Sequence, residues 1–237
     1  MSIKINIQQP SFAPWIGFFE QIKITDIHCF IVDVQVSEKV NLKRTKLQNH
    51  NTNDYFWFNS FLGKHSKFIN INQIKTRDFE NRIKEFSKYF YNNRLYYPYY
   101  LDVIDIINKL KEYKYIYELN IFLIKEICKY FDFNDKKFFV LENDDSYYGK
   151  NLDKNDYLIS IIKKYGAQEY ITGLGARNYI DSFRFKKNDI TLKIMDYKNS
   201  NYNKDNKNFI PYLSIMDLIG KRGKDGKRFI NSSCKQI

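Results

Sequence analysis

Two glycines and an arginine follow a predicted strand, and residues of these types can bind an anion. The strand covers 169–172, and Gly173, Gly175 and Arg177 come directly after it, ahead of a helical segment. Glycines let backbone N–H groups approach a phosphate, the first turn of a helix is partly positive, and a guanidinium pairs with oxyanions. Asn178 stands where a dinucleotide-binding fingerprint has its third glycine, so an ordinary strand-to-helix turn also explains the pattern.

The start of the chain carries polar residues where an open α/β sheet binds its ligands. Isoleucines alternate with polar residues over 3–7, which predicts a half-buried strand. Gln8 and Gln9 follow at the carboxyl end of that strand, the position at which such sheets bind ligands. Trp15, which begins a run with helical spacing, and Tyr179 could stack on a base or a sugar.

Three residues could act as a general base. Asp33, with the amide Gln35, follows the continuous apolar run 27–32, which predicts a second, fully buried strand. His65 lies in a predicted loop and could transfer protons, although an ordinary surface histidine fits the same place. Asp217 lies in a predicted helix near the end of the chain. No nucleophile elbow, P-loop or Cys/His motif occurs, so the sequence predicts neither a catalytic nucleophile nor a metal site.

The formal net charge of +12 leaves several kinds of partner open. Arg44 and Lys46 belong to one basic segment, and the residues after Gly220 include six Lys or Arg against one Asp. The chain is also rich in Lys, Asn, Ile, Tyr and Phe, which AT-rich codons encode, so the charge by itself identifies no ligand. A polyanionic small molecule, an acidic protein and RNA all suit it, but no RRM or KH motif favours nucleic acid.

The sequence predicts a cytoplasmic protein. No signal peptide is recognisable, and no apolar run approaches the roughly 20 residues that a membrane span needs. The three cysteines, Cys29, Cys128 and Cys234, are far apart and odd in number, so they make no disulfide framework. Cys29 and Cys128 lie in apolar segments, as small core residues do.

The order of elements predicts an α/β, Rossmann-like three-layer domain with a central helical insertion. Strands are predicted at 3–7, 27–32, 138–141, 169–172 and 190–194, and a strand, turn and helix over 209–219. Apolar residues at helical spacing predict three helices over 79–90, 101–110 and 117–131. We expect one domain over 1–220 with the insertion at 75–135, a hairpin-like addition from strands at 55–58 and 68–71, and a basic tail over 221–237.

Several motifs, in this order, resemble those of the WbqC-like proteins over about residues 3 to 220. They are Gln9-Pro10-x-x-x-Pro14-Trp15-x-Gly17-Phe18-Phe19, Asp33-Val34-Gln35, Arg44-x-Lys46, Glu118-Leu119-Asn120, Gly166-Ala167-x-x-Tyr170-x-x-Gly173-x-Gly175-Ala176-x-x-Tyr179-Ile180-Asp181 and Pro211-x-Leu213-Ser214-Ile215-Met216-Asp217-Leu218. The chain departs from the family pattern at Lys43, Arg82 and Glu118, which replace an Asn, a His and an Asp. Proposals that give that His or Asn a catalytic role therefore do not transfer here.

The resemblance implies a role in assembling a bacterial surface polysaccharide such as O-antigen. It implies transfer of an acyl or aminoacyl group to the amino group of a nucleotide-linked deoxyamino sugar. The donor would be a thioester of acyl carrier protein or coenzyme A, with no tightly bound cofactor. It also adds Asn120 and Ser214 to the substrate-binding residues. The N-terminal turn is similar to that of HUP-type nucleotide-binding folds, by analogy alone.

Two other functions remain open from the sequence. An adenylate-forming or nucleotidyl-transfer enzyme would fit the HUP-like start and would require ATP and Mg²⁺. A nucleic-acid-binding module would fit the charge alone and would bind RNA or DNA with strong salt dependence.

Overall fold

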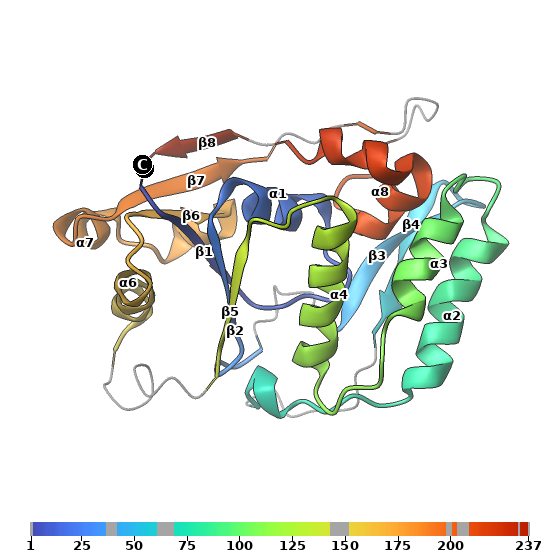
Figure 1. Ribbon diagram of the computed structural model, residues 1–237, viewed down its shortest axis with the longest axis horizontal. Helices are drawn as coiled ribbons and strands as arrows, with labels where there is room; N and C mark the ends of the chain where they lie inside the picture. Colours follow the sequence, from blue (N-terminus) through green and yellow to red (C-terminus); the bar gives the residue numbers. More distant parts are fainter. Residues whose placement is uncertain are drawn as a thin grey trace.

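A six-stranded sheet lies at the centre of the computed structural model, which describes residues 2–36, 42–60, 69–142, 152–197, 201–202, 209–231 and 233–236 (Figure 1). The strands run in the order β5-β2-β1-β6-β7-β8 across the sheet. Their bounds are β1 Lys4–Gln8, β2 Ile27–Ile31, β5 Lys137–Leu141, β6 Glu169–Thr172, β7 Thr191–Asp196 and β8 Ser233–Gln236. The five strands predicted at 3–7, 27–32, 138–141, 169–172 and 190–194 are all present.

The pairing of these strands shows where in the sheet the strand order reverses. β5, β2, β1, β6 and β7 are parallel to their neighbours, and β8 alone is antiparallel, to β7. The chain adds β2 and β5 on one side of β1, and β6, β7 and β8 on the other. Two crossovers therefore leave in opposite directions from the β1–β6 pair, and ligands of open α/β sheets bind in the crevice at such a point.

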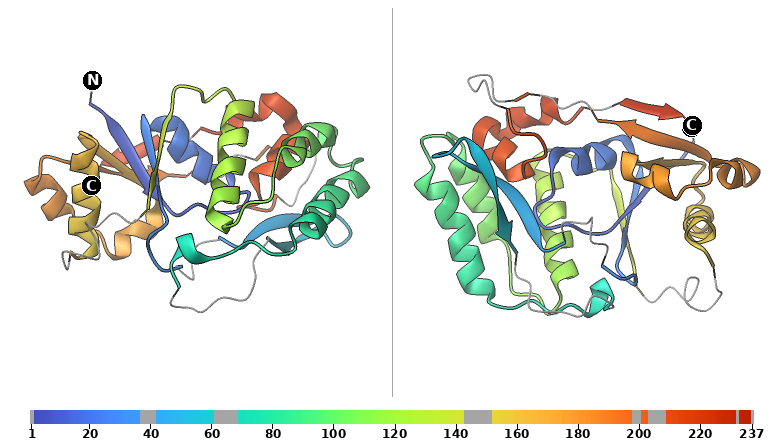
Figure 2. Two further views of the ribbon diagram at one scale, coloured as in Figure 1. Left: turned by 60° about the horizontal axis from the view of Figure 1, so that its bottom comes forward. Right: turned by 180° about the vertical axis from the view of Figure 1, so that it is seen from behind.

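Helices cover both faces of the sheet, because the strands are apolar on both (Figures 1 and 2). Ile5, Ile7 and Cys29 pack with α6 (Lys154–Lys164) and α7 (Ser182–Lys187). Phe30, from the other face of β2, packs in a second core. That core also holds α1 (Ile16–Ile24), α4 (Ile116–Tyr130) and α8 (Ile215–Arg222). The described chain is thus a mixed α/β fold with seven α-helices.

The remaining helices and a small hairpin extend the second core away from α6 and α7 (Figure 2). α2 (Phe79–Asn92) and α3 (Tyr100–Asn108) begin and end close to the helices predicted over 79–90 and 101–110. The hairpin pairs β3 (Arg44–Asn49) with β4 (Asp54–Asn59) in antiparallel register. None of the described helices is both long and apolar enough to cross a membrane.

The partner predicted for the 55–58 strand is wrong. The partner is the basic segment that forms β3, where Thr45 and Leu47 are buried between more exposed polar neighbours. Only one of its six residues is strongly apolar, so the alternation gave too little signal in the sequence. The predicted partner was a strand at 68–71. The structure describes 69–71 of it, and this part leads into a short 3-10 turn, Ile71–Gln73.

The C-terminal part differs from the predictions at two places. Residues 209–213 lie outside the sheet: Pro211 has no N–H to donate, and Tyr212 has φ 61°, which breaks an extended strand. The stretch expected as a basic tail instead forms the 3-10 turn Gly223–Phe229 and strand β8. β8 pairs with the edge of β7, so that Ile194 lies opposite Lys235 and Met195 opposite Cys234.

Candidate functional site

A cavity of about 730 Å³ opens at the carboxyl ends of β1 and β6, where the sheet changes direction. Residues of the turn after β1, the loop after β6, the hairpin and the start of α6 line it. The chain segments that form it are therefore far apart in sequence, as expected for a site at the change of strand order.

The cavity brings together nine of the residues singled out from the sequence. Those from the first half of the chain are Gln8, Gln9, Trp15, Gln35, Arg44 and Lys46. Those from the second half are Gly173, Gly175 and Tyr179. Sequence reasoning missed Gln21, Lys154 and Tyr157, which also line the cavity.

Three cations line the cavity, and aromatic rings hold each of them. The Arg44 guanidinium lies 4.1 Å from the centre of the Trp57 ring, and Lys46 Nζ lies 3.6 Å from that of Tyr55. Lys46 Nζ also donates to the Pro211 carbonyl at 3.2 Å, and burial lowers the pKa of this lysine. At the start of α6, Lys154 Nζ lies 5.4 Å from the centre of the Tyr179 ring. The contacts limit how far these cations can move away from the cavity.

The described lining residues include no carboxylate. Arg44, Lys46 and Lys154 therefore have no acidic neighbour within the described cavity wall, and the Asp54 carboxylate that interacts with Lys46 lies outside it. An anion that enters would meet three positive charges in a partly enclosed space, where charge interactions are stronger than in bulk water. The arrangement suits a phosphate-bearing ligand.

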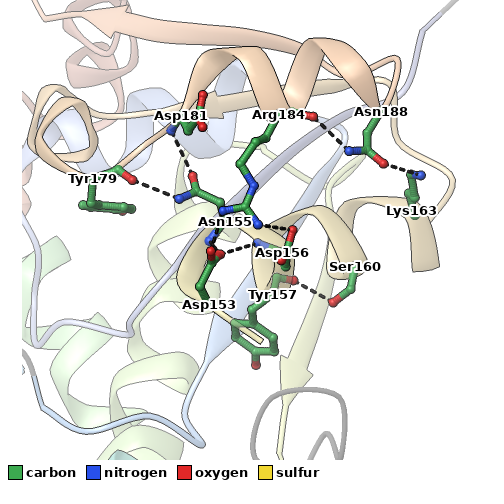
Figure 3. Close-up of polar contacts among 10 residues, drawn as sticks. All are labelled: Asp153, Asn155, Asp156, Tyr157, Ser160, Lys163, Tyr179, Asp181, Arg184 and Asn188. Carbon is green, nitrogen blue, oxygen red and sulfur yellow. Dashed lines mark hydrogen bonds and ion pairs between the residues drawn. The ribbon is translucent and has the colours of Figure 1, made fainter. Parts of the chain in front are cut away.

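A polar network fixes the wall that carries Lys154 and Tyr179 (Figure 3). Asp153 caps α6, accepting hydrogen bonds from the backbone N–H groups of Asn155 and Asp156 at 2.8 and 3.0 Å. Asn155 Nδ2 donates to the Tyr179 carbonyl at 3.1 Å, which ties the start of α6 to the loop after β6. Arg184 of α7 completes the network through ion pairs with Asp153 and Asp156.

Arg177 does not bind in the cavity as the glycine-rich pattern predicted. It is exposed and is not among the lining residues. The loop does not lead into an α-helix N-terminus, because Leu174–Asn178 forms a 3-10 turn and α7 starts only at Ser182. Lys154, from the start of α6, supplies the positive charge on this side instead.

Asp33 is close to the cavity but does not line it. Its side chain is buried, and the Tyr157 hydroxyl donates to its two oxygens at 3.2 and 3.4 Å. Tyr157 does line the cavity. The Tyr157 hydroxyl therefore offers a route for proton exchange between Asp33 and a ligand in the cavity.

The position of the Trp15 ring depends on the glycine two residues later. A Cβ at Gly17 would lie 2.1 Å from the Trp15 indole, so only glycine lets the ring fold back over the first turn of α1. The ring then meets Tyr197 and Tyr212 edge-on, with ring centres 4.5 and 5.1 Å away. These contacts hold the indole at the rim of the cavity.

Asp217, predicted as a general base, does not line the cavity and has structural contacts elsewhere. It is fully buried, accepts hydrogen bonds from Tyr97 and Tyr202 at 2.7 Å, and pairs with Lys221 at 3.0 Å. The buried charge raises the pKa of both tyrosines, together with the larger effect of burial. A ligand bound in the cavity would therefore not touch Asp217.

Asn120 and Ser214, predicted to contact the substrate, do not line the cavity but hydrogen-bond backbone carbonyls. The Asn120 amide is fully buried and donates to the carbonyls of Pro10 and Leu42, both at 3.1 Å. Ser214 caps α8 and donates to the Ala13 carbonyl at 2.9 Å. Both side chains hold the turn after β1 in place. His65, the remaining candidate base, lies outside the described residues.

The chain matches the WbqC-like protein family over residues 9–229. The chain belongs to the WbqC-like protein family. It is also similar to Uncharacterized protein Rv1507c of Mycobacterium tuberculosis (strain ATCC 25618 / H37Rv), with 22% identity over 237 residues that cover 98% of this chain and 99% of that protein. No solved structure matches the chain. Within this WbqC-like chain, the stretches that carried the resemblance divide into those that line the cavity and those that hold its walls.

Proposed function

We propose that this WbqC-like protein transfers an acyl or aminoacyl group from a thioester to the amino group of a nucleotide-linked deoxyamino sugar. The observation that carries the proposal is the cavity between β1 and β6, with Arg44, Lys46 and Lys154 in its wall and no carboxylate among its described lining residues. A nucleotide-linked sugar carries a diphosphate, which needs such cations. The resemblance implies a role in polysaccharide assembly, and this role is the basis for proposing a sugar as the rest of the ligand.

The fold supports the same proposal at a coarser level. Numbered by their order along the chain, the six sheet strands follow the order 3-2-1-4-5-6. That is the order of Rossmann-like sheets, in which a nucleotide binds at the change of strand order. We therefore propose a Rossmann-like ancestry for the sheet, with the nucleotide between β1 and β6.

The reaction requires a free amine and a base. The amine nitrogen attacks the thioester carbonyl, a C–N bond forms, the C–S bond breaks and a thiolate leaves, while the amine loses one proton that is finally passed to the thiolate. Tyr157 faces the cavity and its hydroxyl is bonded to the buried Asp33 carboxylate. In our proposal this pair orients the amine and receives its proton. This sequence of steps needs no covalent acyl-enzyme intermediate.

Direct detection of the product tests the proposal. The purified chain is incubated with uridine-diphosphate-linked and thymidine-diphosphate-linked amino sugars, together with thioesters of coenzyme A or acyl carrier protein. Mass spectrometry should find an amide on the sugar, and Tyr157→Phe should lower kcat by roughly 10²–10⁴ with a smaller change in KM. ATP consumption with Mg²⁺ and an adenylated product, with no transfer from thioesters, would replace the proposal with the adenylate-forming alternative.

A further inference from the structure

Two amide side chains that line the cavity, Gln8 and Gln21, form a network with the buried amide of Asn6 behind them. Asn6 Nδ2 donates to the Ile171 carbonyl and to Gln21 Oε1, both at 2.7 Å. Gln8 Nε2 donates to the same Gln21 oxygen at 2.6 Å. Since the carbonyl of Ile171 can only accept, Asn6 must present its nitrogen, and Gln21 must present its oxygen to both neighbours.

The network leaves one donor and two acceptors of its members without partners. Gln21 Nε2 makes no hydrogen bond to the described residues, and Gln8 Oε1 and Asn6 Oδ1 are buried and unpartnered among them. Gln8 and Gln21 line the cavity, and Gln21 is only 4% exposed. A buried amide atom without a partner costs about 1–3 kcal/mol, so a ligand that satisfies it gains more than one bound by an exposed amide.

The loop after β6 leaves room for a ligand beside this donor. A Cβ at Gly173 would lie 3.4 Å from Gln21 Nε2, in contact with it, and no other heavy atom outside the neighbouring residues comes within 4 Å of that position. Gly173 has an ordinary extended φ of −85°, so backbone strain does not require glycine here. The missing side chain instead keeps the Gln21 amide open toward the cavity. Gln8 lines the same cavity, and its buried Oε1 has no partner among the described residues.

We infer that Gln21 and Gln8 form a subsite for an amide-type group, a carbonyl oxygen beside an N–H. Gln21 Nε2 would donate to the carbonyl, Gln8 Oε1 would accept from the N–H, and Asn6 would hold both in orientation. The inference rests on the proposed function, because the cations would hold the anionic part of the same ligand. An imide edge of a nucleobase and an N-acyl group on a sugar both offer this chemistry.

Binding measurements separate the subsite from the cation site. Both tryptophans of the chain, Trp15 and Trp57, lie in or beside the cavity, so their fluorescence follows binding. Uridine diphosphate is compared with pyrophosphate, and N-acetylglucosamine 1-phosphate with glucosamine 1-phosphate. We expect at least one amide-bearing probe to bind about tenfold more tightly than its partner, and the pair that shows the difference identifies the source of the amide.

Gln21→Met should reduce that ratio to about one while the affinity for pyrophosphate changes less than about twofold. Gln73→Met, at an exposed position outside the cavity, is the matched control and should leave the ratio intact. If Gln21→Met does not fold, Gly173→Val covers the same amide with two methyl groups and should give the same loss. Equal ratios in wild type and Gln21→Met would overturn the subsite alone. No binding of any probe to the wild type would overturn the proposed function as well.

Discussion

At the scale of single residues, Lys154 lines the cavity where the sequence predicted Arg177. The glycine-rich loop pointed to Arg177, yet this side chain is exposed and the charge on that wall belongs to Lys154. Nothing in the sequence around Lys154 marks it, because it is one lysine among many in a Lys-rich chain. The contact with Tyr179 that selects it is formed only when α6 packs beside the loop after β6.

This exchange gives a paired prediction. Lys154→Met should weaken binding of pyrophosphate or uridine diphosphate about tenfold, since a hydrogen bond to a charged group contributes about 1.5–3 kcal/mol. Arg177→Met removes the same charge from the same side of the sheet and should change the dissociation constant less than twofold. Calorimetric titration of both variants is the measurement. The reverse ranking would restore the glycine-rich loop as the anion site.

A second prediction concerns the glycine beneath Trp15. Gly17→Ala should displace the indole and lower the free energy of unfolding by about 1–3 kcal/mol, because the new Cβ would overlap the ring. Gly175→Ala is the control, since no atom outside its neighbours lies within 4 Å of a Cβ there and its φ is not positive. Urea unfolding gives the free energies, and tryptophan fluorescence reports the ring. Equal stability of the two variants would show that Trp15 is not held by this turn.

At the scale of elements, a buried ion pair joins α8 to the α2–α3 end of the molecule and to the hairpin. Lys221 of α8 contacts Asp217 on its own helix and also donates to Gln48 of β3 at 2.6 Å. Tyr97, from the α2–α3 connection, donates to Asp217 and shares a 2.8 Å hydrogen bond with Tyr89 of α2. The hydrogen bond from Lys221 to Gln48 thereby holds the hairpin that carries Arg44 and Lys46 against α8.

Breaking this pair should therefore be costly. Asp217→Ala leaves Lys221 buried without its counter-charge and should lower the free energy of unfolding by about 3–5 kcal/mol. Lys235→Ala breaks a pair with Asp196 in which the lysine is 72% exposed, and should cost less than about 1 kcal/mol. Urea unfolding followed by circular dichroism measures both. A similar small loss in both variants would contradict the structural role of Asp217.

Much of the element order followed from the sequence, because periodicity is local. The strands with isoleucine alternation or apolar runs and the helices with apolar residues three or four apart are where the pattern put them. β3 and β8 were missed because Lys, Arg, Ser and Gln fill most of their positions. Pairing with β4 and β7 stabilises them, and no local pattern reports such long-range pairing.

The site was predicted in part for the same reason. Residues at carboxyl ends of predicted strands, such as Gln8, Gln35 and Gly173, line the cavity because strand position alone brings them there. Gln21, Tyr157 and Lys154 lie on helices, where the face turned to the cavity depends on packing. Asn120 was chosen by resemblance and Asp217 as a candidate base, and the burial of both shows that motif residues can hold a fold together as well as bind a ligand.

At the scale of the whole molecule, a buried histidine makes stability depend on pH. His28 is completely buried among Phe18, Phe30 and Phe138, and burial lowers its pKa to about 3. The unfolded chain, with a histidine pKa near 6.5, binds the proton more readily than the folded chain. The contribution of His28 to the free energy of unfolding is therefore fully present above pH 6.5. It is lost as the pH falls toward 3, because the unfolded chain takes up a proton that the folded chain does not.

The free energy of unfolding should fall by about 2 kcal/mol between pH 7 and pH 5 on account of His28. His28→Phe, which keeps an aromatic ring in the same core, should remove that part of the slope. His50, whose pKa burial lowers to about 4, contributes with the same sign in both proteins, so the difference between them isolates His28. Chemical denaturation at a series of pH values is the measurement. Identical slopes would show that His28 is protonated in the folded protein or exposed to solvent.

We propose that the cavity between β1 and β6 binds a diphosphate-bearing ligand. A crystal structure with such a ligand tests this most directly. Crystals grown with a saturating uridine-diphosphate-linked amino sugar should show the diphosphate between Arg44, Lys46 and Lys154 at the carboxyl ends of the two strands. Density for the ligand at another surface, or an empty cavity when calorimetry shows the protein saturated, would contradict the claim.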